Sequence, residues 1–151
     1  MTKARTLSTA TVLLLLCGAL AISASSAATT VATVNVGQTG LGTILVDGSG
    51  RTLYLFTLDR RGSSSCHSGS VSCVVAWPPL MTTGKPHAGP GVNPALLGTI
   101  RRTTPSGLQV VYNGHPLYRS AGDKQPGDVT GQAVINSWYV VSPTGKAIKK
   151  K

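Results

Sequence analysis

The sequence predicts an all-β fold: a small antiparallel domain made from two tandem hairpin-based repeats that pack as a pseudo-twofold unit, with at most short helical turns. Three observations lead to this prediction. Beyond the N-terminal segment, apolar runs are short, and glycine or proline interrupts the chain every few residues. Helical periodicity is almost absent, and one set of motifs occurs twice in the same order. Short apolar runs between turn residues are typical of strands, and a duplicated motif favours a repeated unit.

The first 28 residues have the features of a secretory signal peptide. A basic start is followed by an apolar run and then by small residues up to Ala28. The run is shorter than the roughly 20 apolar residues that span a bilayer, which disfavours a retained membrane anchor. Lipid anchoring through Cys17 is also disfavoured, because Cys17 lies inside the run and follows Leu16. We expect cleavage after Ala27 or Ala28 and a secreted protein, extracellular or in the cell envelope.

The remaining chain is long enough for one domain. We expect an N-terminal linker at 29–40, a single β domain at 41–145 with repeats at about 41–80 and 107–145 joined by 81–106, and a basic tail at 146–151. Removing Lys3 and Arg5 from fourteen basic residues leaves twelve against four aspartates, a formal charge of +8. This charge favours anionic partners such as cell-envelope polymers. Export disfavours nucleic acid, and we expect no stable membrane span after signal cleavage.

Turn chemistry places the elements along the domain. Strands are expected at Thr43–Val46, Thr52–Thr57, Leu108–Tyr112, Pro116–Arg119 and Trp138–Val141. Residues 47–50 read Asp-Gly-Ser-Gly, a loop sequence between the first two strands. Asn113 and Gly114 predict a type I′ hairpin turn, because both tolerate positive φ. Asn93 followed by Pro94 predicts one short helix that ends at Gly98.

The repeat is defined by residues at nearly constant separation. Tyr54 and Asp59 recur 64 residues later as Tyr118 and Asp123, and Trp77 recurs 61 residues later as Trp138. A unit this small cannot bury its own apolar face, so we expect the two copies to pack together. The two tryptophans should then occupy equivalent, largely buried positions.

These motifs resemble a known family. They comprise Tyr54-x-Phe56-x-x-Asp59, Tyr118-x-Ser120-x-x-Asp123, Trp77-Pro78-Pro79, the segment Leu96–Ile100 and the segment Tyr112–Tyr118. In this order, across residues 41–145, they resemble the secreted-repeat family of bacterial exported proteins and predicted lipoproteins. The resemblance implies a cell-envelope protein and no particular reaction. The chain departs from the family pattern at Ser120, where an aromatic residue is usual, and in the longer segment between its two cysteines.

Candidate binding residues come from the paired motifs and the hairpin, and they are Tyr54, Phe56, Asp59, Tyr118, Asp123 and His115. In the simpler interpretation the aromatic residues belong to the core, and each aspartate accepts backbone N–H groups in its own turn. Alternatively, the aspartates bind a ligand or act as an acid/base pair in a hydrolase. His115 is either an exposed hairpin residue or a proton or metal site.

Cys66 and Cys73 form an even pair in an exported chain, so a disulfide is expected, with no metal and no cofactor. The alternative is a metal- or redox-linked envelope protein that uses both cysteines with His67, Met81 or His87. No catalytic set is evident in the sequence, so we expect no enzyme. The leading hypothesis is a non-enzymatic exported cell-envelope protein, a binding or structural module whose ligand the sequence does not identify.

Overall fold

The computed structural model describes residues 30–67 and 71–150. The predicted signal peptide, its cleavage site and Cys17 lie outside the described residues. Among the helices in the described ranges, none has the length and apolar character needed to cross a membrane.

Short strands dominate the fold, and the helical segments have three to six residues. The order is β1 (Thr33–Thr39), β2 (Gly42–Asp47), β3 (Tyr54–Phe56), α1 (Val71–Ala76), β4 (Met81–Thr82), β5 (His87–Ala88), η2 (Pro94–Leu96), β6 (Leu97–Thr103), β7 (Ser106–Tyr112), β8 (His115–Pro116), η3 (Val134–Asn136) and β9 (Trp138–Val140). The predicted fold class, mostly β with short helical turns, is confirmed.

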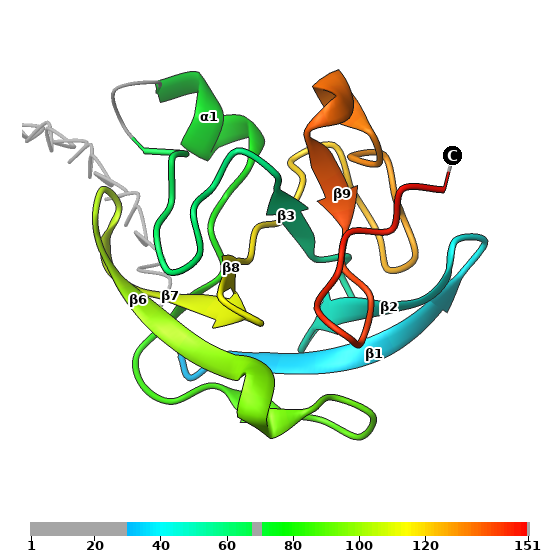
Figure 1. The fold of residues 1–151 in the computed structure, drawn as a ribbon, viewed down its shortest axis with the longest axis horizontal. Coiled ribbons are helices and arrows are strands. Elements are labelled where there is room, and N and C mark those ends of the chain that lie inside the picture. Colours follow the sequence, from blue (N-terminus) through cyan, green and yellow to red (C-terminus); the bar gives the residue numbers. More distant parts are fainter. Residues whose placement is uncertain (1–29, 68–70, 151) are drawn as a thin grey trace, which may run out of the picture.

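The strands form several small sheets rather than one large one. Their orders are β2-β1-β5, β3-β9 and β4-β7-β6, with β8 paired to β7. All pairs between these strands are antiparallel except β1–β5, which is parallel. Figure 1 shows β1 along one side of the molecule, β6 and β7 along the adjoining side, and α1 at the opposite end from β1.

One of the backbone contacts between the two repeats is reciprocal and joins equivalent residues. Tyr54 N–H donates to the Tyr118 carbonyl at 2.9 Å, and Tyr118 N–H donates to the Tyr54 carbonyl at 3.0 Å. These tyrosines are the first residues of the two copies of the motif, so the contact relates equivalent positions in an antiparallel manner. This is the arrangement expected at a pseudo-twofold axis, and it brings the two motifs face to face.

The core has two clusters of buried side chains. One is aliphatic with Tyr112 and includes Val34, Leu45, Leu53 and Val110. The other is aromatic and contains Tyr54, Trp77, Tyr118 and Trp138 together with Cys66. Trp77 and Trp138 are 8% and 2% exposed, so their predicted burial at equivalent positions is confirmed.

Three segments that the sequence places outside the repeats contribute to the fold. The linker at 29–40 contains β1, whose Val34 is fully buried. The joining segment 81–106 contains β4, β5, η2 and β6. The basic tail is not detached from the domain, because Ile148 N–H donates to the Val140 carbonyl at 2.9 Å. β1 and β6 form hairpins with the next strands, β2 and β7. By contrast, β5 pairs with β1 and β4 pairs with β7, which are distant in sequence and which local pattern does not reveal.

The predicted elements were found with shifted ends. The Asn93 side chain accepts the Ala95 N–H at 3.0 Å and caps η2, as predicted, but Leu97 already belongs to β6. The strand expected at Pro116–Arg119 is reduced to β8 and isolated bridges at Tyr118. Helix α1, between Cys66 and the Trp-Pro-Pro motif, was not predicted.

Candidate functional site

The motif tyrosines and aspartates form two crossed pairs. The Tyr54 hydroxyl donates to Asp123 Oδ2 at 2.8 Å, and the Tyr118 hydroxyl donates to Asp59 Oδ2 at 2.6 Å. Each tyrosine therefore bonds the aspartate of the other repeat. All four side chains are buried. The structure thus brings four of the six predicted binding residues into two equivalent contacts between the repeats.

The second oxygen of each carboxylate is also occupied. Asp59 Oδ1 accepts the Ser65 N–H at 2.6 Å. Asp123 Oδ1 accepts the N–H and hydroxyl of Thr130 at 3.0 and 2.7 Å. Each aspartate therefore hydrogen-bonds both a backbone N–H group of its own repeat and the motif tyrosine of the other repeat. This geometry matches the simpler interpretation, in which the aspartates accept backbone groups in turns, and extends it across the domain.

Burial shifts the pKa of Asp59, Tyr54 and Tyr118. It raises the pKa of Asp59 above its usual range, although the bonds from Tyr118 and Ser65 act in the opposite direction. Burial and the neighbouring carboxylates also raise the pKa of Tyr54 and Tyr118 far above the ordinary value. Both tyrosines therefore remain protonated donors over the whole physiological range.

Three further aromatic rings, those of Trp77, Trp138 and Phe56, pack against the crossed pairs. Trp77 and Trp138 stack at 3.9 Å between ring centroids and are nearly parallel. Tyr54 meets Trp77 edge-on at 5.5 Å, and Tyr118 meets Trp138 edge-on at 5.1 Å. Phe56 covers Trp138 with a stacked ring at 4.3 Å. Tyr54, Tyr118 and the two tryptophans are consequently core residues, and the half-buried Phe56 packs against them.

Cys66 and Cys73 form the predicted disulfide, with Cα atoms 5.6 Å apart. Both sulfurs are used in this bond, so no thiolate remains to ligate a metal. Among residues 30–67 and 71–150 there is no group of three or more His, Cys, Asp or Glu side chains that could hold a metal ion. His67 and His87 are exposed, and Met81 lies half-buried in β4.

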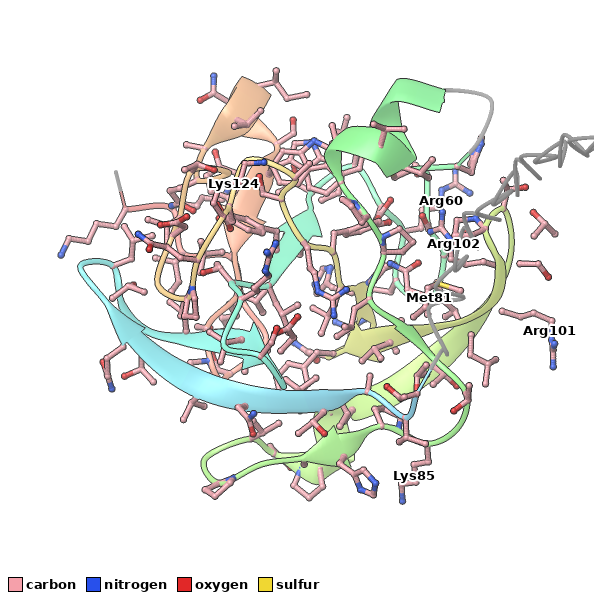
Figure 2. The ribbon with its side chains drawn as sticks, turned by 180° about the vertical axis from the view of Figure 1, so that it is seen from behind. Arg60, Met81, Lys85, Arg101, Arg102 and Lys124 are labelled. Atoms are coloured by element: carbon pink, nitrogen blue, oxygen red, sulfur yellow. A yellow bond between two sulfur atoms is a disulfide. The ribbon has the colours of Figure 1, made fainter. Side chains whose placement is uncertain are left out.

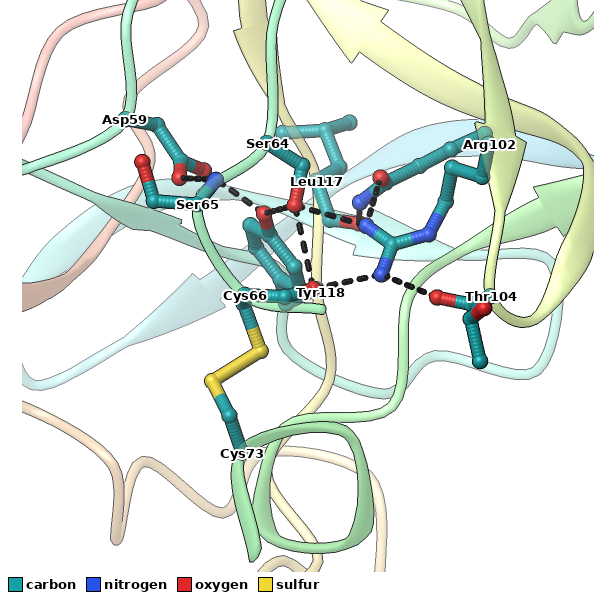
Figure 3. Close-up of a disulfide and its surroundings, with 10 residues drawn as sticks. Asp59, Ser64, Ser65, Cys66, Cys73, Arg102, Thr104, Leu117 and Tyr118 are labelled. Carbon is teal, nitrogen blue, oxygen red and sulfur yellow. Dashed lines mark hydrogen bonds between the residues drawn. A yellow bond between two sulfur atoms is a disulfide. The ribbon is translucent and has the colours of Figure 1, made fainter. Parts of the chain in front are cut away.

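Arg102, which sequence reasoning did not select, holds the cysteine loop (Figure 3). Its guanidinium is buried and donates to Ser64 Oγ at 2.7 Å, Gln109 Oε1 at 2.6 Å and the Cys66 carbonyl. Ser64 Oγ lies 2.6 Å from the Tyr118 hydroxyl. A continuous chain of polar contacts therefore connects β6, the disulfide loop and the Tyr118–Asp59 pair.

His115 is separate from the crossed pairs. It begins β8, directly after the Asn113-Gly114 turn, and Asn113 has the positive φ that the predicted hairpin turn requires. Its Nδ1 atom is buried and has no hydrogen-bond partner within the part of the chain that the structure describes. Burial and the charge of Arg61 lower the pKa of His115, so the neutral ring is favoured.

A second charged site, also missed by sequence reasoning, lies between Asp47 and Arg119. Arg119 Nε donates to Asp47 Oδ2 at 2.5 Å. The pair borders a groove of about 490 Å³ lined by Thr30–Thr33, Asp47–Ser49, Pro79–Met81 and Arg119. Alignment of the two repeats could have indicated this site, because it places Arg119, after Tyr118, at the position of the apolar Leu55, after Tyr54.

Comparison with known proteins agrees with the duplicated architecture. A family model described as a secreted repeat of unknown function matches the chain twice, at residues 35–81 and 101–142. The first match contains Tyr54 and Asp59, and the second contains Tyr118 and Asp123. Each crossed Tyr–Asp pair therefore joins the two matched segments. No curated protein and no solved structure matches the chain significantly.

Proposed function

The chain belongs to the family of secreted repeats of unknown function, and from this premise we propose that it is a non-enzymatic cell-envelope protein whose paired repeats form one rigid module that associates with anionic envelope polymers. The two crossed Tyr–Asp pairs are the observation that carries the first part of this proposal. They use the most distinctive residues of the motif to join the repeats.

Saturation of the aspartates supports a structural role for them. A general acid or base needs an oxygen that can reach substrate. In Asp59 and Asp123 both oxygens already accept hydrogen bonds from neighbouring groups, and both side chains are buried. The motif is therefore suited to hold a scaffold, and a ligand would be bound elsewhere on the surface.

Charge supports the choice of partner. The mature chain that the signal-peptide prediction implies carries +8. The labelled Lys85, Arg101 and Lys124 of Figure 2 come from well-separated parts of the fold, and all three are exposed. A charge distributed in this way favours multi-point attraction to a polyanion, screened within about 8 Å at physiological salt. Phosphate-rich wall polymers and acidic lipid surfaces both have this character.

Sedimentation of the purified mature protein with isolated cell walls tests the association. We expect binding at low salt that is mostly lost at about 1 M salt, where the screening length is about 3 Å. Absence of binding at low salt would overturn the proposed partner class.

One observation favours a second candidate, a hydrolase that uses Asp59 and Asp123. The raised pKa of Asp59 is a property of many general acids. An activity screen over glycoside, ester and phosphoester substrates distinguishes the candidates. Turnover that Asp59→Asn and Asp123→Asn both abolish, while the folded state is retained, would replace the non-enzymatic proposal.

A further inference from the structure

The groove beside Arg119 contains an arginine that a buried carboxylate holds in place. Asp47 is 2% exposed, and its Oδ1 accepts the Ser49 N–H, the Ser49 hydroxyl and the Arg51 N–H at 2.8, 2.7 and 3.0 Å. Its other oxygen accepts Arg119 Nε. Asp47 is therefore fixed by its own loop, and it orients the guanidinium in turn.

The outer nitrogens of this guanidinium remain available. Arg119 is 36% exposed, and its Nη1 and Nη2 atoms donate to no group among the described residues. With Nε already engaged, the two Nη atoms form the end-on edge of the guanidinium. That edge presents parallel N–H groups which match two oxygens of one oxyanion.

The Asp47–Arg119 pair is a departure from the repeat. The residue equivalent to Arg119 is Leu55, which is 2% exposed in the core. The loop equivalent to residues 47–50 is the Tyr112-Asn113-Gly114 turn, which contains no acid. Asp47 belongs to the first copy and Arg119 to the second, whereas the equivalent position in the other direction, Leu55 with the 112–114 turn, has no ion pair. The repeat architecture by itself therefore does not require an arginine at this position.

We propose that this groove binds a phosphate group, with Arg119 as its anchor. The groove is lined by the buried Pro79 and Leu80 and by the hydroxyl-bearing residues Thr30, Thr33 and Ser49. A phosphodiester-linked polyol chain matches this combination. Its phosphate oxygens would bind the arginine, and its hydroxyl and methylene groups would contact the other lining residues. This inference rests on the proposed function, association with anionic polymers. It assigns that association to one groove instead of to the net charge of the whole protein.

Titration of the mature protein with inorganic phosphate, followed by NMR of its backbone amides, tests the site directly. We expect saturable shifts at Ser49, Arg51 and Arg119. Arg119→Gln should weaken phosphate binding about tenfold, the usual effect of losing a charge-assisted pair of hydrogen bonds. Arg101→Gln, which removes the same charge from the exposed face of β6, is the matched control and should bind like the parent.

Two further variants separate binding from folding. Arg119→Gln leaves Asp47 buried and unpaired, so the double variant Asp47→Asn with Arg119→Gln serves if the single variant does not fold. Arg119→Lys keeps the charge but not the parallel N–H edge, and it should also bind more weakly. Equal weakening by Arg119→Gln and Arg101→Gln would overturn the site in favour of net charge. Glucuronate that saturates the groove where phosphate does not would overturn the ligand class.

Wall sedimentation distinguishes failure of the site from failure of the proposed function. If the parent and Arg119→Gln sediment equally with walls at low salt, the groove is not the anchor and the envelope association stands. If the parent binds phosphate saturably but does not sediment with walls, the groove stands and the envelope association fails. Vesicles containing phosphatidylglycerol, in place of walls, show whether a lipid headgroup supplies the phosphate.

Discussion

The two repeats share a scaffold and differ at its edges. Tyr54 with Asp123 and Tyr118 with Asp59 are equivalent contacts, and each tyrosine meets the tryptophan of its own repeat edge-on. The copies diverge next to these residues, where the first has Leu55 and Phe56 and the second has Arg119 and Ser120.

This difference between the two repeats indicates which residues the fold requires. A contact that occurs in both copies can be explained by its role in holding the two copies together. A polar residue that occurs in one copy, where the other has an apolar core residue, needs a separate reason. Arg119 is such a residue, whereas Ser120 accepts the Gly122 N–H at 3.1 Å within its own turn and has a local structural role.

The largest effect is expected at the tryptophan stack. Trp138→Ala should lower the free energy of unfolding by about 3–5 kcal/mol, the usual range for a buried aromatic side chain. Trp77→Ala should cost less, because Trp138 contacts three aromatic rings and Trp77 contacts two. Chemical denaturation of both variants measures the difference. A Trp77→Ala variant as stable as the parent would indicate that Trp77 serves a ligand and not the core.

The burial of these tryptophans could be predicted from sequence, because a repeat that cannot fold alone must bury its largest apolar residues at the contact. The disulfide and the Asn93 cap were also predictable, since both depend on nearby residues. The crossing of the Tyr–Asp pairs could not be predicted, because residue spacing alone does not indicate which copy supplies the aspartate that each tyrosine bonds. β1 was missed since its alternation at Val34 and Val36 is followed by Gly37 and polar residues.

The cysteine loop is the other large difference between the repeats, since the second copy has no counterpart to Cys66 and Cys73. Replacing both cysteines by alanine should cost about 2–3 kcal/mol, the chain-entropy contribution of a short closed loop. Thermal melting of the variant and of the reduced parent should give the same loss. Reduction that leaves the melting temperature of the parent unchanged would show that the Arg102 contacts hold this loop without the disulfide.

The crossed pairs allow a direct test of equivalence. Tyr54→Phe leaves Asp123 Oδ2 and the Gly131 N–H without the tyrosine hydroxyl, and it should cost about 1–3 kcal/mol. Tyr118→Phe should cost a similar amount through Asp59. Tyr139→Phe is the control, because the Tyr139 side chain is buried but its hydroxyl has no hydrogen bond among the described residues. Losses that differ strongly between Tyr54→Phe and Tyr118→Phe would contradict a symmetric scaffold.

The smallest expected effect concerns pH and His115, which belongs to the hairpin of the second repeat. Burial, followed by the charge of Arg61, lowers the pKa of His115 below 6.5, and the charge of Asp59 opposes this shift. The unfolded chain therefore binds more protons than the folded chain as pH falls below about 6.5, and stability decreases from there down to the folded pKa.

The expected loss from His115 is below about 1 kcal/mol, because the side chain is only half-buried and solvent screens its charge. His115→Gln removes this titration, so its free energy of unfolding should fall less than that of the parent as pH is lowered from 7.5 to 5.5. Asp59 acts in the opposite sense: its raised pKa favours the folded state once the carboxyl is protonated at lower pH. Parallel pH profiles for the parent and His115→Gln would show that the hairpin of the second repeat contributes no pH dependence in this range.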